Sequence, residues 1–131
     1  MSIIKYLFLS VFLSSFLFVG YSQKYDENSI TVYQLREQMN SDSNLVILDV
    51  RNKKELSDSL GHIEGVINIP VQVLASRIHE LDKYKNDEIA VICRSGRRSG
   101  IATKLLLKNG FNAENVLGGM EKYHATEKGK N

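Results

Sequence analysis

Cysteine is almost absent from this sequence, in which Cys93 is the only one among 131 residues. A single cysteine cannot form a disulfide within its own chain, so the fold does not depend on one. The Cys-x-x-Cys pair of a thioredoxin-type dithiol mechanism is excluded for the same reason. Cys93 is therefore either an inert, buried apolar residue or a free reactive thiol.

Net charge and recognisable ligand motifs are also scarce. The formal charge is only +2, which argues against nucleic acid as a partner. The three histidines, at 62, 79 and 124, have no metal-ligand spacing with one another or with the cysteine, so we expect no zinc site. The glycine-containing segment 96–100 lacks the Gly-Lys-Ser/Thr ending of a nucleotide P-loop.

The beginning of the chain has few charged residues, since Lys5 is the only one before Lys24. A positive start, an apolar run over 6–19 and small residues at 20 and 22 form the pattern of a secretory signal. We expect residues 1–22 to be a cleaved signal peptide and the rest to be exported, to the periplasm or the cell exterior. The alternative is a membrane anchor over residues 6–23, whose 18 uncharged residues are close to the lower limit for spanning a bilayer.

Residues 23–131 have the size of one domain, in which strand-like and helix-like segments alternate. Largely apolar runs predict strands at 45–50, 66–69, 89–92 and 115–117, and Pro70, the only proline, ends the second. Helical spacing predicts one helix from Val32 to about Asn40 and another around Leu74 and Leu81. A third, ending before Gly110, is predicted to face the core with Ile101, Ala102, Leu105 and Leu106. Residues 52–59 are predicted as a short helix or loop, and 122–131 as a fraying end.

The segment around Cys93 predicts a buried strand, a tight loop and a helix in succession. In that arrangement the loop amides and the first free N–H groups of the helix point toward the cysteine. Arg94, Arg97 and Arg98 follow it closely, and no acidic residue occurs between Glu88 and Glu114. Such surroundings favour a thiolate and attract an anion, so we interpret Cys93 as reactive and not as an inert core residue.

Three blocks then carry a resemblance: "LDVRNKKEL" at 48–56, "GHIEGVINIP" at 61–70 and "CRSGRRSG" at 93–100. In this order and spacing the chain resembles the single-domain rhodaneses, which are thiosulfate sulfurtransferase-like proteins, over about residues 30–123. The resemblance implies an α/β fold whose central parallel sheet is flanked by helices on both faces. It implies no metal and no organic cofactor. Tyr123 stands where many members have tryptophan, a difference we expect to affect packing.

By the same resemblance, Cys93 is the nucleophile that accepts a sulfane sulfur as a persulfide. The donor would be a small anion such as thiosulfate, or a persulfide, and the acceptor cyanide or a thiol. Arg94 and Arg98 occupy the family's substrate-binding positions, with Ser95, Gly96 and Arg97 completing the loop. Arg97 is expected to face solvent, and the protein is expected to be a monomer.

Two smaller groups of residues are given structural interpretations. Asp49, Arg51 and Glu55 are predicted to form a buried charge network, because charges at strand ends are normally paired. His62 could form a catalytic pair with Cys93. By resemblance its position belongs to a structural turn, which we favour.

Two other functional classes remain as alternatives. The rhodanese fold resembles that of the dual-specificity cell-cycle phosphatases, which need Cys-x5-Arg. Here the sixth residue after Cys93 is Ser99, which argues against phosphate chemistry. The other alternative is a non-catalytic binding or redox-sensing module, because exposed low-pKa thiolates oxidise readily.

Overall fold

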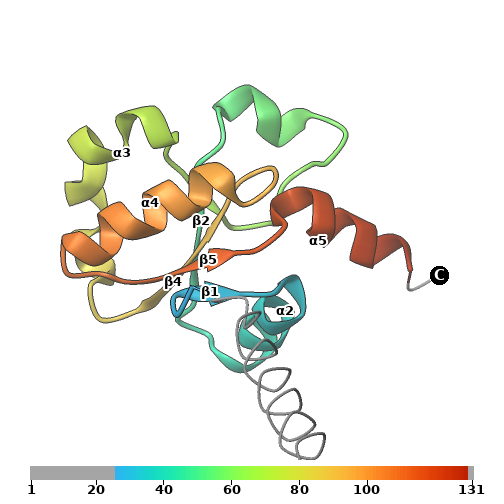
Figure 1. Ribbon diagram of the computed structural model, residues 1–131, viewed down its shortest axis with the longest axis horizontal. Coiled ribbons are helices and arrows are strands. Elements are labelled where there is room, and N and C mark those ends of the chain that lie inside the picture. Colours follow the sequence, from blue (N-terminus) through green and yellow to red (C-terminus); the bar gives the residue numbers. More distant parts are fainter. Residues whose placement is uncertain (1–25, 130–131) are drawn as a thin grey trace, which may run out of the picture.

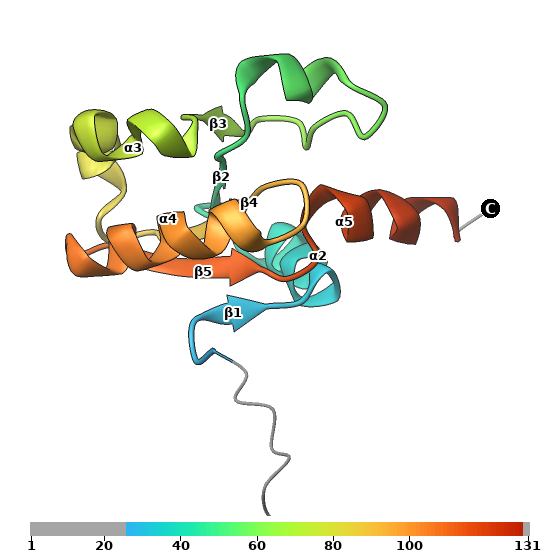
Figure 2. The same cartoon turned by 45° about the horizontal axis from the view of Figure 1, so that its top comes forward.

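The computed structural model describes residues 26–129, so the predicted signal peptide at 1–22 and its anchor alternative lie outside the described part. Within that part, five parallel strands form one sheet in the order β1-β5-β4-β2-β3 (Figures 1 and 2). The strands are β1 (Ser29–Ile30), β2 (Val46–Asp49), β3 (Ile67–Asn68), β4 (Glu88–Ile92) and β5 (Asn112–Val116). No helix among residues 26–129 combines the length and apolar composition needed to cross a bilayer.

Helical segments connect these strands, as parallel pairing requires. The α-helices are α2 (Val32–Ser41), α3 (Val71–Arg77), α4 (Arg97–Lys108) and α5 (Gly119–Lys128). Two 3₁₀ helices, η1 (Lys53–Ser57) and η2 (Ile78–Tyr84), complete the described elements. The predicted alternation of strands and helices, and the α/β class, are therefore confirmed.

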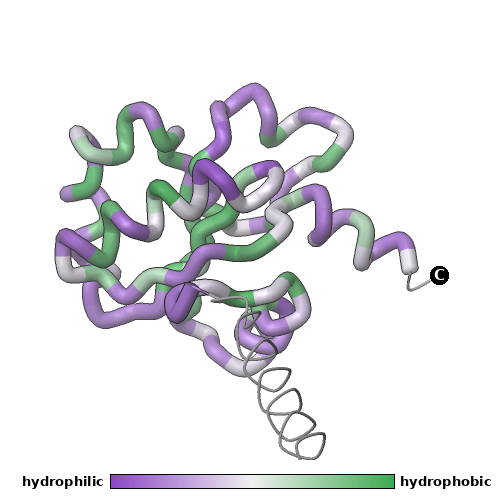
Figure 3. Tube along the Cα trace, viewed as in Figure 1, coloured by the Kyte–Doolittle hydropathy of each residue, from purple (hydrophilic) through white to green (hydrophobic). Residues whose placement is uncertain are grey.

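The sheet is buried on both faces, which explains why β2 and β4 are almost continuously apolar. Along β4, Ile89 and Val91 face one core together with Leu74 of α3 and Leu106 of α4. The intervening Ala90 and Ile92 face a second core, which contains Val32, Leu35, Met120 and Tyr123 from α2 and α5. Figure 1 shows α4 and α2 on opposite sides of the strands, and Figure 3 shows the hydrophobic residues gathered along them.

The end of α4 confirms the predicted role of Gly110. This glycine has a φ of +83°, and its N–H donates to the Leu107 carbonyl at 3.1 Å. Phe111 N–H donates to the Leu106 carbonyl at 3.1 Å, and the Phe111 ring is buried. These two bonds form the Schellman motif, which satisfies the last carbonyls of the helix.

The prediction that Ile101 faces the core is wrong, because its side chain is 59% exposed. The buried stripe of α4 consists of Ser99, Ala102, Thr103 and Leu106, which follow the i, i+3, i+4, i+7 spacing. That stripe excludes position 101. The buried face of α4 thus includes two hydroxyl-bearing residues, Ser99 and Thr103, and leaves Ile101 outside.

The C-terminal prediction also needs correction, since α5 continues to Lys128 and does not fray from residue 122. Tyr123 is buried, and the Arg36 guanidinium lies 3.9 Å from the centre of its ring. Arg36 also donates to the Tyr123 carbonyl at 3.0 Å and to the Thr126 hydroxyl at 3.1 Å. These contacts from α2 hold the last helix to the domain.

Candidate active site

Cys93 lies at the carboxyl end of β4, between the neighbouring strands β2 and β5. This end of a parallel sheet is where α/β proteins bind their ligands. Gly96 has a φ of +102° and precedes the first residue of α4. The predicted succession of strand, tight loop and helix is confirmed, and it turns the loop back over the cysteine.

The sulfur of Cys93 is surrounded by hydrogen-bonding groups of the loop and of α4. The Gly96 N–H lies 3.1 Å from Sγ and the Ser99 hydroxyl 3.2 Å from it, while the side chain is only 1% exposed. Burial raises the pKa of the thiol, but contact with the Ser99 hydroxyl and hydrogen bonds from the N–H groups of Ser99, Gly96 and Ser95 together outweigh it. The net effect holds the pKa of Cys93 below its ordinary value. Loop donors, more than arginine charges, thus favour the thiolate.

Arg98 is bound by an acid from another part of the chain. Its guanidinium makes two bonds to the Glu55 carboxylate, at 2.7 and 2.8 Å. The side-chain bond to Arg98 lowers the pKa of Glu55 to about 2, with smaller help from the Asn52 N–H. Glu55 therefore stays ionised at neutral pH, and Arg98 ties the start of α4 to η1.

Arg94 is also paired, but more loosely. Its Nε donates to Glu121 of α5 at 3.0 Å, and its Nη1 lies 3.6 Å from Asp58. Half of the Arg94 side chain is exposed, and Arg97 is exposed as well. Although the sequence has no acidic residue between Glu88 and Glu114, the fold brings acidic side chains from other segments next to the loop.

The predicted charge network is present in a modified form. Asp49 and Arg51 are both fully buried, and Arg51 makes Nε and Nη2 bonds of 2.8 to 3.1 Å to the Asp49 carboxylate. Arg51 also donates to the carbonyls of Gly61, at 2.8 Å, and Glu55, at 3.2 Å. Glu55 joins this network through its backbone, whereas its carboxylate serves Arg98. The group supports η1 and the loop after it.

The first turn of α5 supports the loop after Cys93 through backbone hydrogen bonds. Met120 N–H donates to the Cys93 carbonyl at 2.8 Å, and Glu121 N–H donates to the Arg94 carbonyl at 3.0 Å. A Cβ on Gly119 would lie 2.5 Å from both carbonyl oxygens, so only glycine fits there. No sequence pattern indicated that the turn at Gly118-Gly119 supports the loop.

Sequence reasoning missed the two buried polar residues behind the cysteine. The Ser99 hydroxyl donates to Oδ1 of Asn115 at 2.6 Å, and Nδ2 of Asn115 donates to the Gly96 carbonyl at 3.1 Å. Asn115 lies on β5, where the only available signal was a polar residue beside apolar ones. No pattern in the sequence connects it to Cys93.

The imidazole of His62 is turned to the backbone of the preceding turn. Its Nδ1 atom lies 3.0 Å from the Leu56 carbonyl, and the side chain is exposed. This contact matches the structural turn that was favoured over a catalytic pair. Within the residues that the structure describes, no cluster of three or more His, Cys, Asp or Glu side chains could hold a metal ion.

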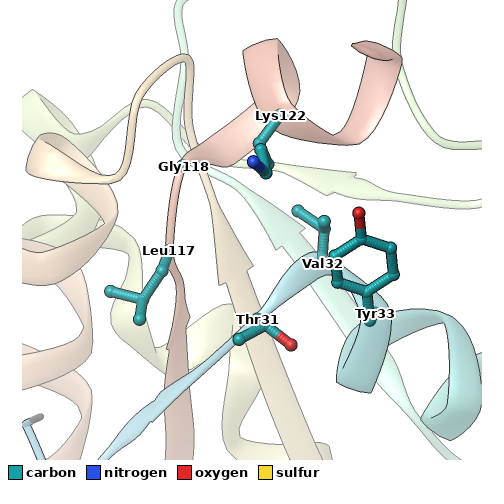
Figure 4. Close-up of a pocket in the computed structure, with 6 residues that line it drawn as sticks. All are labelled: Thr31, Val32, Tyr33, Leu117, Gly118 and Lys122. Atoms are coloured by element: carbon teal, nitrogen blue, oxygen red, sulfur yellow. The ribbon is translucent and has the colours of Figure 1, made fainter. Parts of the chain in front are cut away.

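A largely apolar pocket of about 320 Å³ lies on the other side of the Gly118 turn from the loop (Figure 4). In the figure, Lys122 of α5 and Tyr33 of α2 flank it, and Gly118 lies to its left above Leu117. Gly118 packs closely against Gly96, which places this pocket next to the loop and separates it from Cys93. Its lining residues are Thr31, Val32, Tyr33, Leu117, Gly118 and Lys122.

Comparison with known proteins agrees with this geometry. Residues 31–126 match the rhodanese-like domain family, and the chain belongs to it. It is similar to a rhodanese-like domain protein from Staphylococcus aureus of known structure, with a TM-score of 0.66 and 29% identity over 73% of this chain and 90% of that one.

Two relatives have names that indicate different functions, sulfur carrier and sulfurtransferase. A candidate sulfur carrier protein of Bacillus subtilis, YrkF, is 41% identical over 70% of this chain, which spans only 48% of that relative. The thiosulfate sulfurtransferase PspE of Escherichia coli is 34% identical over 56% of this chain and 69% of its own length.

Proposed function

We propose that this protein is a sulfurtransferase in which Cys93 carries a sulfane sulfur from thiosulfate or a persulfide donor to cyanide or a thiol. One observation carries the proposal above all others. The sulfur of Cys93 is buried at the end of β4 beside the Ser99 hydroxyl and loop N–H groups that together lower its pKa. Membership of the rhodanese-like family and the name of the Escherichia coli relative support the same chemistry.

The reaction needs no general base once the thiolate has formed. The Cys93 thiolate attacks the outer sulfur of thiosulfate, a new S–S bond forms, and sulfite leaves with the electron pair of the broken bond. A thiolate or cyanide then attacks the outer sulfur of the persulfide, and Cys93 departs as the thiolate. The donor supplies the oxidised sulfur, so no further oxidant or reductant is required.

The loop can stabilise both anionic states of the cysteine. The Gly96 N–H already points at Sγ, and the neighbouring N–H groups of Ser95 and Ser99 contribute in the same direction. Fixed donors aimed at a charged centre need no rearrangement during the reaction. We assign these groups to the thiolate and the persulfide, and not to the sulfonate end of the donor.

We assign the sulfonate end to Arg94. Its side chain is 49% exposed, and ion pairs of such exposure contribute little, so an incoming anion can displace Glu121. Arg98 is in a different position, because both of its bonds to Glu55 are short and Glu55 stays ionised. We therefore propose that Arg98 mainly holds the loop in place, and that exposed Arg97 contributes long-range attraction to anions.

A carrier function is the second candidate, and one relative's name favours it. In that case Cys93 would hold a sulfur for a partner protein without rapid transfer to small acceptors. Steady-state thiosulfate:cyanide assays of the wild type and Cys93→Ser separate the two. If the protein is a sulfurtransferase, the wild type turns over thiosulfate and cyanide. The Cys93→Ser variant does not, because the serine hydroxyl is only weakly nucleophilic. A wild type that never turns over with any small acceptor would exclude the enzyme and leave the carrier.

We further propose that residues 1–22 are a signal peptide, that the domain works outside the cytoplasm, and that it is a monomer. The charged start, the apolar run and the small residues before position 23 support export. N-terminal sequencing of the protein from its native host should find Gln23 first. A protein that keeps Met1 and stays with the membrane would instead support the anchor over residues 6–23.

A further inference from the structure

A ring of hydrogen bonds joins the sulfur of Cys93 to the buried amide of Asn115. The Ser99 hydroxyl lies 3.2 Å from Cys93 Sγ and 2.6 Å from Asn115 Oδ1. Asn115 Nδ2 lies 3.1 Å from the Gly96 carbonyl, and the Gly96 N–H lies 3.1 Å from Sγ, which closes the ring. Ser99 is fully buried and Asn115 is only 8% exposed, so bulk water does not serve these groups.

The chemistry of the partners fixes the direction of each bond. A carbonyl oxygen can only accept, so the amide of Asn115 must turn its NH₂ toward Gly96. Oδ1 of Asn115, also an acceptor, then faces the Ser99 oxygen at 2.6 Å and takes the hydroxyl proton. A serine hydroxyl has one proton to give, so Ser99 cannot donate to Asn115 and to Cys93 at the same time.

The two protonation states of Cys93 therefore differ in how well the ring is satisfied. A thiol donates its own proton to Ser99, and every bond in the ring is made. A thiolate has no proton to give, so Ser99 must either keep facing Asn115 or turn its proton to the sulfur. Turning it leaves the buried Oδ1 of Asn115 without a donor, which is costly.

We propose that Asn115 is a positioning residue that holds the Ser99 hydroxyl proton and so limits its donation to the sulfur of Cys93. A thiolate that is held by fewer donors keeps more of its nucleophilicity. Asn115 thus lowers the fraction of Cys93 that is thiolate at neutral pH, and it makes each thiolate more nucleophilic. The loop amides continue to support the anion in either arrangement.

The charged groups around the site are engaged elsewhere. Arg98 interacts with the charge of Cys93, but its hydrogen bonds go to Glu55. The exposed imidazole of His62 contacts the Leu56 carbonyl. The other charged side chains near the loop are Asp49, Arg51, Asp58, Arg94 and Glu121. Among the hydrogen bonds and ion pairs of residues 26–129, none of these five bonds to Ser99 or Asn115.

The test is the pH dependence of Cys93 alkylation by iodoacetamide, measured on the full domain with Asn115→Leu. Leucine has a similar size and no acceptor, so the Ser99 proton becomes free to bond to the thiolate. We expect the pKa of Cys93 to fall by about one pH unit, the order expected for one charge-assisted hydrogen bond. The Gly96 carbonyl keeps its bond from the Gly100 N–H, at 3.1 Å, so the substitution does not leave it unpaired.

Ser99→Ala supplies the control, because Asn115 acts only through Ser99. In the Ser99→Ala background, Asn115→Leu should leave the pKa of Cys93 unchanged. The proposal is overturned if Asn115→Leu alone leaves that pKa unchanged or raises it. It is equally overturned if the fall persists without the Ser99 hydroxyl. Circular dichroism checks the fold, and Asn115→Ala carries the same expectation should the leucine variant not fold.

Alkylation reports on the thiol whether or not the protein transfers sulfur. A failure of this inference would leave the sulfurtransferase proposal standing. Conversely, a domain that never turns over thiosulfate could still show the predicted titration.

Discussion

Arg98 and Glu55 meet through two bonds of 2.7 and 2.8 Å although 43 positions separate them in the sequence. One residue lies in the first turn of α4, directly after the loop that follows Cys93, and the other lies in η1. Both side chains are mostly shielded, with 28% and 23% exposed. The pair therefore connects the start of α4 to η1, two segments that lie far apart in the sequence.

The Glu55 pair gives the domain a pH-dependent stability. Because its folded-state pKa of about 2 lies below the ordinary 4.5, its contribution is complete above about pH 4.5 and is lost as pH falls toward 2. Glu55→Gln should lower the unfolding free energy at pH 7 by about 2 kcal/mol, after allowance for partial exposure. It should also flatten the loss of stability below pH 4.5. Urea unfolding at several pH values measures both.

Glu80→Gln is the matched control for that experiment. Glu80 also forms a two-bond pair with an arginine, Arg77, but both side chains are more than 40% exposed. Such surface pairs contribute little, so this variant should resemble the wild type. If both substitutions lowered the unfolding free energy equally, the Glu55–Arg98 pair would have no special role in stability.

Arg94→Ala should separate donor binding from sulfur chemistry. Loss of a charge-assisted bond to the sulfonate should raise the KM for thiosulfate roughly ten- to a hundredfold, with a smaller fall in kcat. A neutral organic persulfide should be affected much less. Arg97→Ala, which removes another exposed charge, is the control and should change KM less. If Arg94→Ala acted on both donors equally and only through kcat, Arg94 would be activating the thiolate.

Glu121 provides the converse test of the same role. Its carboxylate takes the Arg94 Nε bond at 3.0 Å and so competes with an incoming anion. Glu121→Gln should lower the KM for thiosulfate, by up to about fivefold for an exposed ion pair. A KM that rises instead would mean that Glu121 orients Arg94 for the donor.

Gly119→Ala should damage the active loop itself. The new Cβ would lie 2.5 Å from the carbonyl oxygens of Cys93 and Arg94, and the residue would have a φ of +56°. We expect a loss of about 2–4 kcal/mol in unfolding free energy and a clear fall in kcat. Gly110→Ala has a φ of +83° but no atom within 4 Å, so it isolates the backbone cost of about 1–2 kcal/mol. Equal losses of stability and activity in both variants would exclude a special role for Gly119.

The sequence was a good guide wherever short-range physics decides. The apolar run before Cys93 and the glycine after it were enough to predict a strand, a loop and a helix start. Gly110 predicted a helix end whose two hydrogen bonds span only a few residues. The buried face of α4 was predicted only in part, because it includes the polar Ser99 and Thr103 and excludes the apolar Ile101.

Contacts between distant segments could not be read in this way. The acids that pair with Arg94 and Arg98 come from η1, the turn after it and α5, so a window around Cys93 does not contain them. Asn115 reaches Cys93 only because β5 lies beside β4 in the sheet. Likewise, α5 extends beyond Tyr123 because Arg36 of α2 binds its backbone.

The most direct test of sulfur transfer through Cys93 is the intact mass of the purified domain after incubation with thiosulfate and removal of the excess. The wild type should gain one sulfur atom, and cyanide should remove it again with thiocyanate formed in equal amount. Cys93→Ser, in which an un-ionised hydroxyl replaces the thiolate, should gain nothing. A wild type whose mass does not change, or a Cys93→Ser variant that gains the same sulfur, would contradict sulfur transfer through Cys93.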